Sequence, residues 1–304
     1  MIFLALQKAR AVFAGGGTRV IALIGAYERV SEAKLFSFEA FAGVSAGSLV
    51  AFLANVGMSA EEMLAHVTRE NLMNLIDPYG FPEGAIFWLY NRFAKSKQEK
   101  TPPQFLINPF TKKIVGALID RRIKKSNHLL RGRALEEWVK RIVEDQGVKY
   151  FRELKKELLV VTFDLMKGQP LIFSRKTTPD AEISFAITAS MSAWPLFPIK
   201  KYYYDDKQRK QFTSLVDGGL WNKYPFDIFE PFYQDDAPTV GFRLTSSETA
   251  RRDQFDIKLS GTPLSDLSPR LQGILMLVDI ILSMQDGVYL PDYDYFWTTS
   301  ADTG

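Results

Sequence analysis

The pentapeptide Gly43-Val44-Ser45-Ala46-Gly47 constrains the fold of this chain more than any other segment. Residues 38–42 before it form a short apolar run typical of a strand, and residues 48–56 after it are typical of a helix. A serine on a sharp strand-to-helix turn projects its hydroxyl outward, where the N–H groups of the following helix converge. A chain of this length contains such a pentapeptide by chance roughly 0.1 times. The pentapeptide alone therefore makes Ser45 a candidate nucleophile, and a second and a third signal are needed.

The composition is that of a globular protein without thiol chemistry. Of the 304 residues, 46% are hydrophobic and 24% charged, and there is no cysteine, which excludes disulfides and fits a reducing compartment. The apolar start at residues 1–6 is too short for a signal-peptide core, and no apolar run approaches the ~18 residues of a membrane span. We therefore expect a cytoplasmic protein, either soluble or peripheral at a membrane.

Short apolar runs alternate along the chain with segments of helical periodicity, which predicts an α/β fold. Strands are expected at residues 11–14, 158–163, 171–174 and 239–244, with a hairpin at 202–216. Helices are expected at residues 20–33, 134–146, 182–190 and 269–285, and a capping box of Ser59 and Glu62 begins another that runs toward Ile76. The pattern predicts one three-layer α/β/α domain over residues 1–304, with a central, mostly parallel sheet.

Residues 77–133 interrupt this alternation and are predicted to form a helical, basic insertion, with a helix at about 111–125. Between Arg92 and Arg133, twelve Lys and Arg stand against two acidic residues, a net charge of +10 in a chain whose total is +3. Aromatic side chains lie among these cations. This composition suits an anionic lipid surface, a nucleic acid, an anionic signalling molecule or a solvated helical face.

A serine nucleophile needs a base, and the usual histidine is poorly placed here. In the common hydrolase order, the serine is followed by the acid and then by the histidine. The two histidines of this chain are His66 and His128, so no histidine follows an acid that lies later in the sequence. We expect both histidines to have surface or core roles. A carboxylate is then the remaining candidate base.

Asp217 is the favoured carboxylate because it ends an apolar strand at Gly218-Gly219, where a loop can bring the backbone close to a ligand. A simple Asp-Gly-Gly turn is the alternative interpretation. An exposed aspartate is a poor base for an alcohol, so a working dyad requires Asp217 to be partly buried, hydrogen-bonded to Ser45 and raised in pKa. Asp164, which follows the strand at 158–163, is the next base to consider.

A third signal is the run Gly15-Gly16-Gly17, which follows one strand and precedes a helix. Such a run leaves backbone N–H groups free to converge on an anion. The third glycine of a dinucleotide fingerprint is absent, and no Gly-Lys-Ser/Thr of a P-loop follows. An oxyanion hole for acyl transfer therefore suits the run better than a nucleotide site.

In order and spacing, these motifs resemble the patatin-like phospholipase family over about residues 9–225. The matching segments are Gly15-Gly16-Gly17-Thr18-Arg19, Gly43-Val44-Ser45-Ala46-Gly47, the block from Ala189 to Pro198, Asp217-Gly218-Gly219, and Asn222 to Pro225. The resemblance implies that Ser45 is the nucleophile, Asp217 the general base, and Gly16, Gly17 and Thr18 the oxyanion hole. The supporting motif residues are Gly15, Arg19, Gly43, Gly47, Gly218 and Gly219.

The chain departs from the family at Val20, where the glycine loop usually ends in another glycine. Since valine adopts a positive φ only at a cost, the exit from the loop is expected to differ. Arg19 is expected to orient the loop, to neutralise a head-group phosphate or to form a structural salt bridge.

The resemblance implies a serine acyl hydrolase that acts on phospholipids or lysophospholipids and requires neither calcium nor another metal or cofactor. It favours contact of residues 92–133 with an anionic membrane, and no nucleic acid is expected. The alternatives are a broad esterase or thioesterase, a catalytically idle lipid- or nucleotide-binding module, and a phospholipase effector of bacterial antiviral defence. In that last case a cyclic nucleotide or similar anionic small molecule would be the activator.

Overall fold

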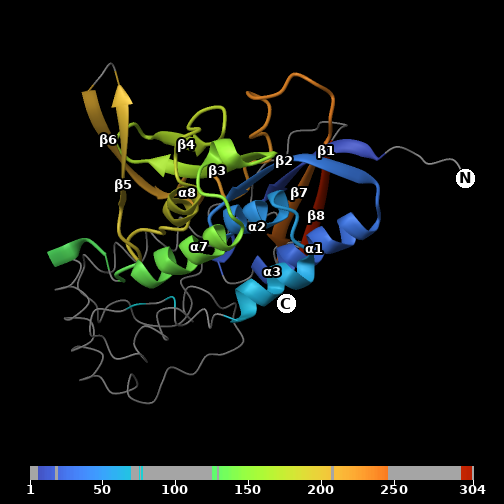
Figure 1. The fold of residues 1–304 in the computed structure, drawn as a ribbon, viewed down its shortest axis with the longest axis horizontal. Coiled ribbons are helices and arrows are strands. Elements are labelled where there is room, and N and C mark those ends of the chain that lie inside the picture. The colour runs from blue at the N-terminus through green and yellow to red at the C-terminus, as the bar shows by residue number, and fades with distance from the viewer. Residues whose placement is uncertain are drawn as a thin grey trace, which may run out of the picture.

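The computed structural model describes residues 6–17, 20–69, 75, 77, 125–128, 130–206, 209–245 and 296–302. Its centre is an eight-stranded sheet in the order β5-β6-β3-β2-β1-β7-β8, with β4 paired to β3 (Figure 1). The strands are β1 Gln7–Phe13, β2 Phe36–Val44, β3 Glu157–Asp164, β4 Gln169–Phe173, β5 Lys200–Asp206, β6 Arg209–Asp217, β7 Thr239–Thr245 and β8 Phe296–Asp302.

The sheet is mixed, with a parallel part and an antiparallel part. The neighbours β8, β7, β1, β2 and β3 pair in parallel, whereas β4, β6 and β5 join by antiparallel pairing. β3 belongs to both parts, and it is buried along nearly its whole length. A strand buried on both faces reads as a continuous apolar run, and Leu158–Phe163 has that pattern.

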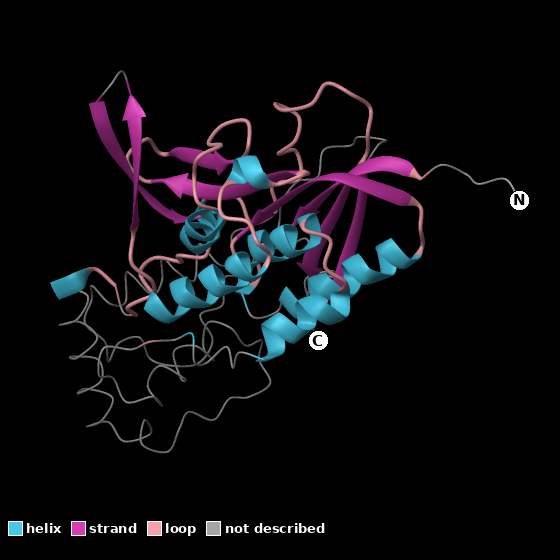
Figure 2. Ribbon diagram, viewed as in Figure 1, coloured by secondary structure: helices cyan, strands magenta, loops and turns pink. Residues whose placement is uncertain are grey.

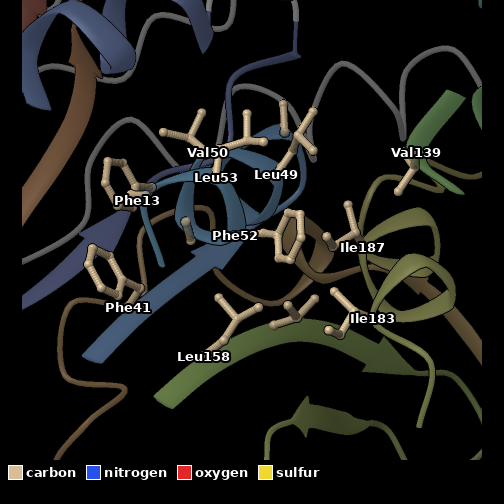
Figure 3. Packing of buried hydrophobic residues seen from close by; sticks show 14 of the residues in the cluster. Phe13, Phe41, Leu49, Val50, Phe52, Leu53, Val139, Leu158, Ile183 and Ile187 are labelled. Carbon is tan, nitrogen blue, oxygen red and sulfur yellow. The ribbon is translucent and has the colours of Figure 1, made fainter. Parts of the chain in front are cut away.

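Five helices lie on one face of the sheet: α1 Val20–Glu32, α2 Ala46–Asn55, α3 Ala60–Arg69, α7 Arg133–Asp145 and α8 Ile183–Ser190 (Figure 2). Every residue of α2 is buried, because this helix lies between the sheet and its neighbouring helices. In Figure 3, Phe52 of α2 lies beside Ile187 of α8, and Leu49, Val50 and Leu53 lie on another side of the helix within the same apolar cluster. The helix that follows Ser45 is therefore fixed by packing along its whole length.

The opposite face of the sheet carries a smaller apolar cluster. Val12, Val44 and Val161 point to this side, and the segment that contains Tyr224, Phe226, Ile228 and Phe229 covers them. The cover is close, since a Cβ added to Gly241 of β7 would lie 2.6 Å from a ring carbon of Phe226. Within the described residues, an irregular segment rather than a helix closes this face.

The register of β3 places the ends of β2 and β6 together. Val44 of β2 pairs with Val161, and Asp217 of β6 pairs with the next residue, Thr162. β4 occupies the other edge of β3 at both positions. β2 and β6 therefore share one edge of β3 and run toward each other, so that their carboxyl ends meet.

The predicted α/β class with a mostly parallel sheet is confirmed, and most predicted elements are present within one to four residues of their expected bounds. The Ser59–Glu62 capping box is also present, with hydrogen bonds from Ser59 N to Glu62 Oε2 (2.8 Å) and from Glu62 N to Ser59 Oγ (3.3 Å). The predicted helices at 111–125 and 269–285 lie almost wholly or wholly outside the described residues. Most of residues 77–133 lies outside them as well.

Two strands differ from the expectation. β1 begins at Gln7 rather than at residue 11. The sequence pattern misses this start because Arg10, a charged residue typical of a surface position, is buried in the strand. Its guanidinium lies 4.1 Å from the ring centre of Tyr233 and pairs with Asp235. The edge strand β8, Phe296–Asp302, is not anticipated by the sequence analysis.

Asp77 joins the two ends of the predicted insertion. Its carbonyl oxygen accepts a hydrogen bond from Arg131 N (3.0 Å), and its carboxylate accepts from Gly132 N (2.7 Å) and Arg133 N (2.8 Å). These N–H groups open α7, so the carboxylate caps the helix. Asp77 and the start of α7 are therefore in contact although 55 residues separate Asp77 from Gly132 in the sequence; the insertion itself remains a prediction.

Candidate active site

Ser45 lies at the turn between β2 and α2, as the pentapeptide predicts. Its backbone has φ 53° and ψ −134°, a left-handed conformation that is costly for a residue with a side chain. The two flanking glycines make this turn possible. A Cβ on Gly43 would lie 2.6 Å from Ser48 Cα, and one on Gly47 would lie 2.6 Å from the carbonyl oxygen of Phe13.

The structure brings Ser45 and Asp217 together. Ser45 Oγ donates a hydrogen bond to Asp217 Oδ2 at 2.7 Å, across 172 residues of sequence. The other carboxylate oxygen accepts from Gly219 N at 2.7 Å and so caps the short 3-10 helix η4, Gly218–Leu220. Asp217 therefore forms the turn that its sequence suggests and also contacts the candidate nucleophile. Both side chains are partly exposed, which leaves them reachable from solvent.

Burial raises the pKa of Asp217 from 3.8 to about 6. The hydrogen bonds from Ser45 and Gly219 and the positive charge of Lys223 act in the opposite direction, but they are smaller than the effect of burial. A carboxylate with this pKa is mostly ionised at neutral pH and is a stronger base than an exposed aspartate.

The glycine loop lies beside Ser45. A Cβ added to Gly15 would lie 3.2 Å from Ser45 Cβ, so only glycine keeps an ordinary contact there. Gly15 N donates to the carbonyl oxygen of Lys223 (2.8 Å), whereas within the described residues Gly16 and Gly17 have no partner for their N–H groups. Gly17 has φ 56°, and Val20 begins α1 as a buried residue. The positive φ thus falls on Gly17; Thr18 and Arg19 lie outside the described residues.

The other candidate bases lie elsewhere. His66 is on α3 and His128 precedes Leu130, while the hydroxyl of Ser45 bonds to Asp217. Asp164 is buried at the end of β3, where its Oδ1 accepts from Met166 N (2.9 Å), Lys167 N (3.1 Å) and the hydroxyl of Thr213. Those bonds hold the turn between β3 and β4, which is a structural role.

Two residues next to the candidate dyad were not singled out in the sequence analysis. Ser190 Oγ accepts a hydrogen bond from Ser45 N at 2.8 Å, and Lys223 contributes positive charge near Asp217. Both lie in segments that match the family pattern, the Ala189–Pro198 block and the Asn222–Pro225 stretch. Their position in these two segments is the sequence signal that could have identified them, but it does not say which side chains reach Ser45 or Asp217.

Residues 11–230 match the family model described as patatin-like phospholipase. The chain belongs to the patatin-like phospholipase family. The matched range runs from β1 through η4 and includes the glycine loop, Ser45 and Asp217. Within the described part of this patatin-like protein, no group of three or more His, Asp or Glu is placed to hold a metal ion. None of its described helices has the length and apolar character needed to cross a membrane.

Two known proteins are similar to this patatin-like chain in sequence. YqhO of Bacillus subtilis strain 168, which is uncharacterized, is 25% identical over 257 residues, 79% of this chain and 72% of YqhO. The probable lipid hydrolase 463L of Invertebrate iridescent virus 6 is 35% identical over 81 residues, 26% of this chain and 25% of that protein.

Solved structures show a weaker likeness. VipD from Legionella pneumophila matches 80% of this chain and 51% of its own, with a TM-score of 0.45 and 18% identity. ExoU of Pseudomonas aeruginosa, in its complex with SpcU, matches 93% of this chain and 52% of its own, with a TM-score of 0.37 and 12% identity. The chain thus spans about half the length of these proteins.

The raised pKa of Asp217 predicts that Asp217→Asn stabilises the fold at high pH. The ionised carboxylate is less stable in the folded protein than in the unfolded chain, so wild-type stability decreases as pH rises from about 4 to about 6. We expect Asp217→Asn to raise the free energy of unfolding by about 2 kcal/mol at pH 8, a value discounted for partial exposure. The gain should shrink to near zero at about pH 4.

Urea denaturation at pH 4, 6 and 8 measures this difference. Asp227→Asn is the matched control, because it makes the same change at an exposed aspartate. A gain that is constant with pH, or equal in both variants, contradicts the account.

Proposed function

We propose that this patatin-like protein is a serine acyl hydrolase that cleaves fatty-acyl ester bonds of phospholipids or lysophospholipids. The observation that carries the proposal is the 2.7 Å hydrogen bond from Ser45 Oγ to Asp217 Oδ2 at the end of two converging strands. Membership of the family and the partial similarity to a probable lipid hydrolase support an acyl ester as the substrate.

In the proposed acylation step, Ser45 Oγ attacks the ester carbonyl carbon while its proton passes to Asp217 Oδ2. The C–O bond to the leaving group then breaks, and the protonated Asp217 donates its proton to the departing alcohol or lysolipid. Water attacks the acyl-enzyme in the second step, again giving a proton to Asp217. Release of the fatty acid restores the hydroxyl of Ser45 and the carboxylate.

The oxyanion of each step is proposed to be held by the glycine loop. Because the N–H of Gly15 is bonded to Lys223 and that of Ser45 to Ser190, neither is free to stabilise the developing charge. Gly16 and Gly17 come next along the loop, and we propose them, together with Thr18, as the donors. The amino-terminal end of α2, which begins directly after Ser45, adds a favourable dipole.

Turnover of a generic acyl ester tests the dyad. Ser45→Ala removes the nucleophile and Asp217→Asn removes the base, so each should reduce kcat/KM by about 10³-fold or more. Asp227→Asn should retain wild-type activity, because Asp227 is exposed and remains outside the proposed machinery. Near-normal rates in Asp217→Asn would contradict the dyad, and Asp164 would become the next base to replace.

Defined phospholipids and lysophospholipids then test the substrate class. Release of fatty acid is the expected result. Turnover of short esters or thioesters alone would indicate a broad esterase, and lipid binding without turnover of any ester would indicate an idle binding module. Either result contradicts the proposal.

We propose further that residues 92–133 contact anionic membrane, with the net charge of +10 as the support. In co-sedimentation, the protein should pellet with vesicles that contain phosphatidylserine at low salt and be released at high salt. Neutral phosphatidylcholine vesicles are the control. Binding that is absent, or that salt leaves unchanged, contradicts the docking proposal.

A further inference from the structure

We infer that Ser190 is a positioning residue that holds the backbone of Ser45 in its reactive conformation, an inference that rests on the proposed role of Ser45 as nucleophile. Ser190 is the last residue of α8 and is fully buried. Its Oγ accepts a hydrogen bond from Ser45 N at 2.8 Å and donates one to the carbonyl oxygen of Val161 at 2.6 Å.

The direction of both hydrogen bonds is fixed by the groups involved. A carbonyl oxygen only accepts, so the single proton of the Ser190 hydroxyl goes to Val161. A lone pair of the same oxygen then accepts from the N–H of Ser45. The hydroxyl thus bridges the backbones of β2 and β3 at the point where their direct pairing ends, at Val44 and Val161.

This bridge acts where the backbone is strained. Ser45 has φ 53°, a conformation that persists in a non-glycine residue only when surrounding contacts enforce it. The bond to Ser190 is such a contact, because it fixes the direction of the Ser45 N–H. It thereby fixes the position from which the Ser45 hydroxyl reaches Asp217.

The segment directly after α8 holds the backbone of the second member of the dyad. Asp217 N donates to the carbonyl oxygen of Ser192 at 3.0 Å, two residues beyond Ser190. One short segment therefore sets the backbones of both Ser45 and Asp217. The side chain of Ser192 takes no part in this, since its hydroxyl donates to the carbonyl oxygen of Thr188 (2.7 Å).

Ser190→Ala and Ser192→Ala form a matched pair for the test. Both remove one buried hydroxyl near the end of α8, and only the first removes a contact with Ser45. A fluorophosphonate serves as the active-site titrant: Ser45 Oγ bonds to phosphorus, the P–F bond breaks, fluoride leaves and the serine proton passes to Asp217. The titrated sites give the concentration of competent enzyme, and ester turnover is expressed per titrated site.

Ser190→Ala should lower kcat per titrated site by about 10- to 100-fold with KM within about threefold of wild type, because displacement of a nucleophile acts on the chemical step. Ser192→Ala should remain within about threefold in both. A purely structural role of Ser190 would reduce the number of titrated sites and leave the rate per site unchanged. If Ser190→Ala does not fold, Ser190→Cys replaces it, because a thiol is a weaker donor and acceptor than a hydroxyl. Its loss of kcat per titrated site should be smaller than the loss of about 10- to 100-fold expected for Ser190→Ala but greater than that of Ser192→Ala.

Equal rates per site in wild type and Ser190→Ala, or equal losses in the two alanine variants, would overturn the role of Ser190 and leave the dyad standing. A wild-type protein that neither reacts with the fluorophosphonate nor turns over an ester would overturn the proposed function, and the role of Ser190 with it.

Discussion

The shared edge of β3 is the constraint on which the candidate site depends. β2 reaches Val161 from one direction and β6 reaches Thr162 from the other, so the residues at their carboxyl ends have to meet. Ser45 and Asp217 occupy those ends, and their 2.7 Å hydrogen bond follows from the register of the sheet. The arrangement needs both a parallel and an antiparallel neighbour along the same strand, which explains why the mixed part of the sheet lies at the site.

The rest of the fold stabilises a site that is unfavourable in itself. Ser45 has a left-handed backbone, and burial of Asp217 raises its pKa to about 6. Three features offset the cost of the Ser45 backbone. The wholly buried helix α2 fixes the exit from the turn, and Ser190 bonds to the N–H of Ser45. Gly43 allows β2 to approach the start of α2 closely, and Gly47 allows the turn to approach the end of β1. A strained turn at a functional site is expected where packing on every side determines the backbone.

The sequence predicts local features of this protein well and its long-range contacts poorly. Periodicity placed α1 and the buried strand β3, and the pentapeptide placed Ser45 on its turn. Asp217 was selected by exclusion of histidine and by resemblance, although its contact with Ser45 spans 172 residues. Arg10 and Ser190 illustrate the limit: each is a polar residue with a partner more than 140 residues away, so neither local pattern nor composition reveals that it is buried.

The pH dependence of kcat/KM for an acyl ester tests the central claim most directly. If Asp217 accepts the proton of Ser45, only its ionised form is active, and the rate should rise about tenfold per pH unit below a midpoint near 6 and level off above it. A midpoint near 4 would contradict the buried, raised-pKa base. A profile that is flat across pH 5 to 8 would contradict the assignment of Asp217 as the base.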